Sequence, residues 1–65
     1  MGMESIAIRN TKAGEFIKRK PEAAAVYKRG HYVPSLKAFS CTDCDDISRE
    51  IFIKADKAVY VGFTY

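Results

Sequence analysis

Two cysteines three positions apart form the pattern in this chain that is most typical of a chemical site. As thiolates, Cys41 and Cys44 could share one tetrahedral zinc ion, with His31, the only histidine, as a third ligand. A structural zinc site needs four ligands, so a carboxylate or a second chain would have to complete the set. Redox-active pairs of this spacing sit at helix N-termini, whereas Asp43 and Asp45 flank these cysteines and disfavour the thiolate. We therefore interpret Cys41 as a half-buried strand residue and Cys44 as an incidental residue of an acidic loop, and we expect no metal and no cofactor.

His31 and the two cysteines are also residue types that can act as a base and a thiol nucleophile. The chain has only 65 residues, and a core of this size leaves little room for a substrate pocket. No oxyanion-hole motif accompanies these residues. The sequence therefore predicts that the protein is not an enzyme.

Interleaved basic and aromatic residues in the middle of the chain are the strongest functional signal. In a strand over 26–32, Tyr27, Arg29 and His31 would share the outward face, and Lys54 would join them from a later strand. Small β-barrels bind single-stranded nucleic acid in this way, because rings stack on unpaired bases while cations follow the phosphates. A single β-bulge would reverse which residues face outward. The predicted nucleic-acid-binding residues are Lys18, Arg19, Tyr27, Arg29, His31 and Lys54.

Charge is distributed unevenly along the chain, whose net charge is +3. Positions 9–37 hold eight Lys or Arg and two Glu, whereas positions 38–57 hold three Lys or Arg and five Asp or Glu. This asymmetry favours one basic face that attracts phosphates or an acidic partner. On charge alone, the favoured interpretation is a surface that only keeps a small domain soluble, because small domains commonly carry a net charge of this size.

Short strands must position these residues, because apolar and polar residues alternate with period two along most of the chain. We expect strands over 5–9, 15–18, 26–32, 37–41, 49–54 and 58–65, with tight turns at Gly14 and Pro34. The stretch 21–25 begins with Pro21 and favours one helical turn, while the choice between helix and strand for 21–28 stays open. The pattern predicts one all-β domain spanning 1–65. Its expected form is a small antiparallel barrel or strongly bent sheet of five or six strands, similar in size to SH3-like and OB-like barrels.

The last eight residues, 58–65, form the strongest strand pattern and contain no charged side chain. An exposed edge of this kind would promote aggregation, so we expect the strand to be central or paired. Pairing with a second copy is the alternative, and the sequence therefore also predicts a homodimer through the C-terminal strand. The inner face of the strand is expected to carry Val59, Val61 and Phe63, opposite Tyr60 and Thr64.

These observations together predict a non-enzymatic binding domain. The favoured function is weak, salt-sensitive binding of single-stranded nucleic acid through the basic and aromatic face. The alternative is a protein–protein interaction module, a small adaptor or inhibitor of the kind that mobile genetic elements encode, with exposed tyrosines as anchors. The chain has no signal-peptide pattern at its start and no apolar run near the roughly 18 residues of a membrane helix, so we expect a cytoplasmic protein without membrane contact.

Overall fold

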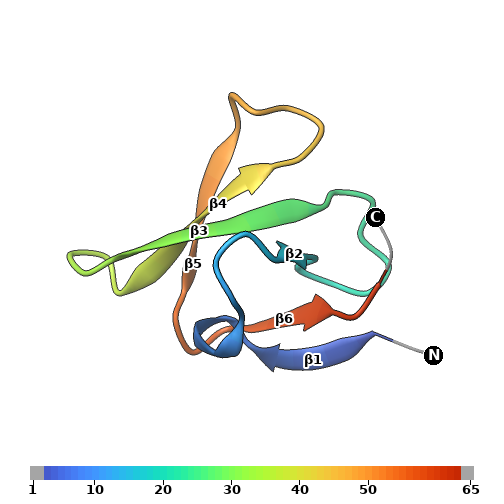
Figure 1. Cartoon of the computed structure of the whole chain (residues 1–65), viewed down its shortest axis with the longest axis horizontal. Coiled ribbons are helices and arrows are strands. Elements are labelled where there is room, and N and C mark those ends of the chain that lie inside the picture. Colours follow the sequence, from blue (N-terminus) through green and yellow to red (C-terminus); the bar gives the residue numbers. More distant parts are fainter. Residues whose placement is uncertain (1–2, 64–65) are drawn as a thin grey trace.

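The computed structural model describes residues 3–63, which form six short strands and one 3₁₀ turn. Every ladder between these strands is antiparallel. Four strands form one curled sheet in the order β2-β3-β4-β5, and the other two form the pair β1-β6 (Figure 1). The predicted fold class, a β-rich antiparallel barrel or bent sheet, is therefore confirmed. The elements are β1 (Glu4–Ala7), η1 (Ile8–Asn10), β2 (Phe16–Ile17), β3 (Tyr27–Val33), β4 (Ala38–Asp43), β5 (Glu50–Lys54) and β6 (Ala58–Val61).

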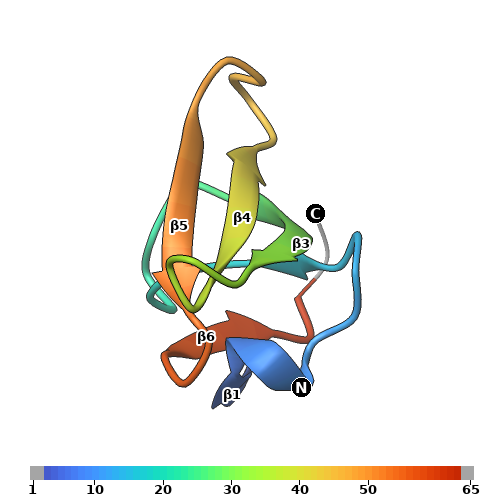
Figure 2. The same ribbon diagram turned by 90° about the vertical axis from the view of Figure 1, so that its left-hand side faces the viewer.

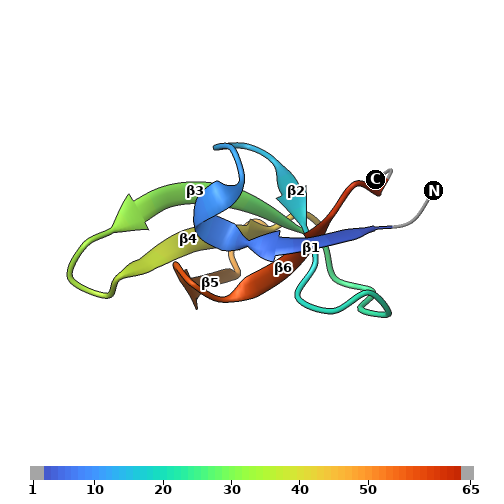
Figure 3. The ribbon, with the colours of Figure 1, turned by 90° about the horizontal axis from the view of Figure 1, so that it is seen from below.

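The two sheets are joined at the end of β2, where Lys18 forms a β-bridge with Tyr60 of β6. The Lys18 N–H donates to the Tyr60 carbonyl at 3.0 Å, and the Tyr60 N–H donates to the Lys18 carbonyl at 2.8 Å. The β1–β6 pair consequently crosses beneath the four-stranded sheet (Figure 3). The result is a half-barrel, because the opposite side between β5 and β1 has no strand ladder within residues 3–63.

The turn η1 closes part of this open side through its backbone. The Ile8 N–H donates to the Lys57 carbonyl at 2.9 Å, and the Arg9 N–H donates to the Ala55 carbonyl at 3.1 Å. The Thr11 hydroxyl caps the turn by donating to the Ile8 carbonyl at 2.6 Å. Because these contacts hold the chain after Ala7 against the turn at 55–57, the first strand ends at Ala7 and does not run to position 9 as predicted.

The hydrophobic core fills the space between the two sheets. Its fully buried side chains are Ile8, Ile17, Cys41 and Val59, contributed by the turn η1 and three different strands. In β6, Val59 and Val61 are buried on the inner face, as predicted from their spacing. The whole cluster comprises Ile8, Ile17, Tyr27, Phe39, Cys41, Ile53, Val59 and Val61.

A β-bulge interrupts the ladder between β3 and β4. Arg29 pairs with Cys41 and Tyr32 pairs with Phe39, so Gly30 and the residue after it both lie opposite one residue of β4. Cys41 and Phe39 are two positions apart on β4, so their side chains lie on the same face of the sheet. Arg29 and Tyr32, which pair with them, therefore also face this side.

The stretch 21–25 does not form the predicted helical turn. It follows a turn in which the Ala23 N–H donates to the Lys20 carbonyl at 3.1 Å, and the one helical turn among residues 3–63 is η1. A single helical turn cannot offset the cost of helix nucleation when its alanines bury so little apolar surface. The Pro34 turn is confirmed, since the Leu36 N–H donates to the Val33 carbonyl at 3.1 Å.

The C-terminal strand is paired, as expected, but it is shorter than the predicted range 58–65. It ends at Val61, because Gly62 adopts a φ of 87° that interrupts the extended backbone, and Phe63 is not in a strand. Residues 58–61 pair with β1 along their full length, and Tyr60 meets Lys18 on the other side. The strand β6 therefore has a partner on each side within the chain, and a second copy is not needed to pair it. Thr64, predicted on the opposite face, lies outside the described residues. Among residues 3–63, no helix is long and apolar enough to cross a bilayer.

Candidate functional site

A groove lies on the open side of the half-barrel, beside β5. It has a volume of about 570 Å³ and runs between β5, the start of β6 and the segment 19–25. Figure 2 shows β6 passing below the lower end of β5, and in Figure 1 the segment 19–25 lies to the right of β5, across the groove. The residues that line the groove are Arg19, Lys20, Ala23, Ala25, Tyr27, Phe52, Ile53, Lys54, Lys57, Ala58 and Val59.

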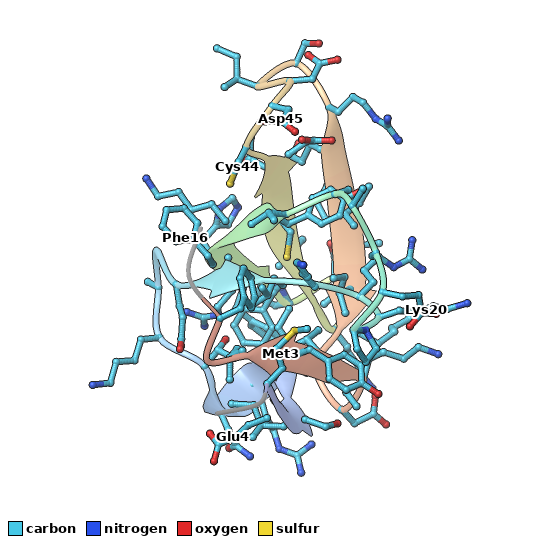
Figure 4. The ribbon with its side chains drawn as sticks, turned by 90° about the vertical axis from the view of Figure 1, so that its right-hand side faces the viewer. Met3, Glu4, Phe16, Lys20, Cys44 and Asp45 are labelled. Atoms are coloured by element: carbon cyan, nitrogen blue, oxygen red, sulfur yellow. The ribbon has the colours of Figure 1, made fainter. Side chains whose placement is uncertain are left out.

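The groove is strongly basic. Its charged lining residues within the described chain are four cations, and no Asp or Glu lies among them. All four are exposed, and the sticks of Figure 4 show Lys20 reaching outward from its loop. Because like charges that converge on a concave surface create a positive potential, the groove attracts anions. The cations are Arg19, Lys20, Lys54 and Lys57.

Two cations reach the groove from either end of the tight turn that joins β5 to β6. The Lys57 N–H donates to the Lys54 carbonyl at 2.9 Å, which closes this turn. The Lys54 ammonium also donates to the Leu36 carbonyl at 3.1 Å, and this contact holds its stem along the sheet. The backbone of this turn therefore fixes the positions from which the Lys54 and Lys57 side chains extend.

Two aromatic residues contribute to the groove in different ways. Phe52 remains 49% exposed on the outer side of β5, which leaves its ring accessible to a flat ligand. Tyr27 is only 6% exposed and forms part of the groove wall. One ring of the groove can thus stack on an incoming base, while the other shapes the wall.

The prediction that Tyr27 faces outward is wrong. Tyr27 pairs with the fully buried Ile17 and belongs to the core cluster, so the alternation of β3 points its side chain inward. Arg29, two positions later, shares this inner face, and its guanidinium lies 4.1 Å from the centre of the Phe39 ring. His31 lies in the bulge, where the alternation is interrupted, and it is exposed. The outward set predicted for this strand is therefore reduced to His31.

The structure brings three of the six predicted site residues together. Arg19, Tyr27 and Lys54 line the groove, whereas Lys18, Arg29 and His31 do not. The Lys18 ammonium lies 5.0 Å from the centre of the Phe63 ring. The Nε of Arg29 is buried without a hydrogen-bond partner, beside Phe39.

Three lining residues that carry charge or an exposed ring lie outside the predicted set of six. The sequence places Lys20 and Phe52 next to predicted residues, because Lys20 follows Arg19 and Phe52 lies two positions from Lys54 on the same face of a strand. Lys57 lies three positions after Lys54 and is placed by the tight turn that their backbones close. Contacts between this turn and η1, which join distant parts of the sequence, hold the turn in place.

The two cysteines do not form a site with His31. Cys41 is fully buried in the core, while Cys44 lies beyond the end of β4 and is half-buried, on the same side as Phe16 in Figure 4. Both thiols are free, and nowhere in residues 3–63 do three or more His, Cys, Asp or Glu side chains group as metal ligands. The structure thus leaves the zinc alternative, Cys41, Cys44 and His31, without an assembled ligand set.

Both thiols are held in the protonated form. Burial raises the pKa of Cys41 to about 11. Desolvation, followed by the charges of Asp43 and Asp45, raises the pKa of Cys44 as well. The thiolate is the reactive form of cysteine, so neither residue is activated for redox or nucleophilic chemistry at neutral pH.

A second, smaller hollow of about 270 Å³ lies on the outer face of the sheet, lined in part by Phe16, Cys44 and Ile47. Ile47 is 85% exposed and Phe16 is 41% exposed. This hollow is more apolar than the groove beside β5 and shares no lining residue with it.

Comparison of the chain with protein-family models, curated proteins and solved structures finds no match.

Proposed function

We propose that the protein binds single-stranded nucleic acid in the groove beside β5. The observation that carries this proposal is a groove lined by four cations, with an exposed aromatic ring at its side and no acidic residue within its described lining. Phosphates would lie along Arg19, Lys20, Lys54 and Lys57, while one base stacks on Phe52. Stacking of this kind requires an unpaired base, which favours a single strand over a duplex.

The proposed mechanism is binding without catalysis. The groove offers positive charge and a ring on which a base can stack. The two cysteines lie outside the groove, and their thiols are protonated at neutral pH. Of the six residues predicted from the sequence, Arg19, Tyr27 and Lys54 belong to the proposed site, and we propose a cytoplasmic location for the complex.

The proposal is tested by titrating a labelled mixed-sequence oligonucleotide at two salt concentrations. We expect the affinity to fall steeply with salt, because each bound phosphate releases counterions. Arg19→Ala and Lys57→Ala should each weaken binding and reduce the salt slope by about one. Lys12→Ala removes an exposed cation outside the groove and serves as the matched control. Absence of binding at low salt, or equal losses in all three variants, would show that the proposal is wrong.

A protein–protein interaction is the second candidate function. It is favoured by the exposed side chains of Ile47 and Phe16 around the smaller apolar hollow. An interface centred on such side chains would weaken far less with salt than nucleic-acid binding would. Oligonucleotide binding that weakens steeply with salt therefore favours the first function, and absence of oligonucleotide binding at low salt favours the second.

A further inference from the structure

β5 forms one edge of the four-stranded sheet, and its outward side has no strand partner among residues 3–63. The hydrogen bond from the Asp43 N–H to the Arg49 carbonyl, 3.0 Å long, fixes the phase of the ladder between β4 and β5. Bonded pairs alternate in an antiparallel ladder, so Ile51 and Ile53 direct their N–H and C=O groups toward β4. The N–H and C=O groups of Phe52 therefore point to the free side.

The sequence of β5 is complementary to itself. It reads Glu-Ile-Phe-Ile-Lys, with Phe52 at its centre. When two copies of this strand lie antiparallel around Phe52, each Glu50 stands opposite Lys54 of the second copy, and each Ile51 stands opposite Ile53 of the second copy. The backbone groups agree with this register, because the N–H and C=O groups of Glu50 and Phe52 and the N–H of Lys54 all point to the free side. The Lys54 carbonyl already accepts from the Lys57 N–H.

The side chains that would meet are exposed and lie on one face of the sheet. Glu50 and Lys54 are exposed, and Phe52 is 49% exposed. The Ser40 hydroxyl donates to the Glu50 carboxylate and keeps this side chain on the outer face of β4 and β5. Cross-strand pairs of opposite charge and of aromatic rings are the contacts that stabilise antiparallel strands.

We infer that two copies of this chain associate through the free edges of their β5 strands, antiparallel and centred on Phe52. The two half-barrels would then share one continuous sheet around a two-fold axis. Such an interface is closed, because the same β5 edge is used on both copies and neither copy has a second β5 edge for a third chain. The edge that pairs is thus β5, and the C-terminal strand keeps its partners within the chain.

The association has a consequence for the groove, and this consequence rests on the proposed function. Lys54 lines the groove, so its partner in the dimer, Glu50 of the second copy, would bring a carboxylate to the groove of each copy. A phosphate and this carboxylate would compete for the same cation. We therefore expect nucleic acid and the second copy to exclude each other.

The test is sedimentation or light scattering over a range of protein concentrations, without nucleic acid. We expect the wild-type chain to dimerise as concentration rises. Glu50→Lys and Lys54→Glu should each weaken the dimer by about tenfold to a hundredfold, because each replaces two attractive cross-strand pairs with two repulsive ones. The double variant carrying both changes restores opposite charges and should dimerise like the wild type. Circular dichroism of each variant checks that it folds.

A wild-type chain that stays monomeric at its highest soluble concentration would overturn the inference. A dimer that is unaffected by both single reversals, or that the double variant fails to restore, would overturn it equally. Nucleic-acid binding is measured separately, on dilute monomer. A dimer without nucleic-acid binding would contradict only the proposed function, whereas binding without a dimer would contradict only this inference. If both occur, added oligonucleotide should convert dimer to monomer.

Discussion

Gly30 lies so close to Ser40 across the bulge that position 30 has no room for a side chain. A Cβ at this position would stand 2.7 Å from the Ser40 carbonyl oxygen, which belongs to the backbone and cannot rotate away. The close approach lets β3 place two residues against one of β4, and the bulge therefore depends on glycine.

Gly30→Ala should consequently destabilise the fold by about 1–3 kcal/mol, the usual cost of forcing extra volume into a packed site. Urea unfolding measures this loss. Ser35→Ala, in the exposed turn between β3 and β4, should stay within about 0.5 kcal/mol of the wild type. Equal midpoints for the wild type and Gly30→Ala would show that the bulge can be rebuilt without cost.

Replacing Lys37 with glycine should stabilise the fold. Lys37 adopts a φ of 53° after the Pro34 turn, a conformation that costs a side-chain-bearing residue about 1–2 kcal/mol. Lys37→Gly removes this strain but increases the entropy of the unfolded chain, so we expect a net gain of up to about 1 kcal/mol. Thermal unfolding gives the readout. Ser35→Gly, where φ is not positive, should not stabilise, and a loss of stability in Lys37→Gly would contradict the account of this turn.

Stability should fall at alkaline pH because of Cys41. Burial raises the pKa of this thiol from 9.0 to about 11, so the folded state holds a proton that the unfolded state releases between these values. The stabilisation is complete below pH 9 and is lost as the pH rises toward 11, at up to about 1.4 kcal/mol per pH unit. Urea unfolding on both sides of pH 9 tests this. Cys41→Ala should show a smaller alkaline loss than Cys44→Ser, and equal losses would show that Cys41 is not the cause.

The two thiols should also differ in their accessibility to a thiol reagent. Cys44 is half-buried at the end of β4, whereas Cys41 has no exposed surface. A disulfide reagent near pH 8 should modify Cys44 in the folded protein, slowly because the pKa of Cys44 is raised, and reach Cys41 only after unfolding. Cys44→Ser should therefore leave no thiol that reacts in the native state. Rapid native labelling of Cys41 would contradict its place in the core.

Local patterns predicted those parts of the fold that local contacts determine. The alternation of Val59 and Val61 identified β6, and Pro34 identified its turn, because each depends on neighbours in the sequence. The end of β1 at Ala7 could not be predicted in the same way. It depends on hydrogen bonds between η1 and the turn at 55–57, which lie nearly fifty positions apart.

The candidate site was predicted only in part for the same reason. Arg19 and Lys54 were recognised from the distribution of charge, but their common groove forms because the segment 19–25 crosses beside β5. Tyr27 was assigned to the wrong face, because nothing in the sequence shows that its neighbour on β2 is the buried Ile17. Lys57 lies only three positions after Lys54, but the contact that holds their shared turn against η1 is non-local.

We propose that Phe52 and the cations around it bind single-stranded nucleic acid. The most direct test compares Phe52→Ala with Phe16→Ala in oligonucleotide titrations at low salt and low protein concentration. The two rings are exposed to a similar degree, 49% and 41%, but only Phe52 lines the groove. We expect Phe52→Ala to lose about 1–3 kcal/mol of binding free energy through the lost stacking, while Phe16→Ala binds like the wild type. Equal affinities for the two variants, or no binding by the wild type, would contradict the account.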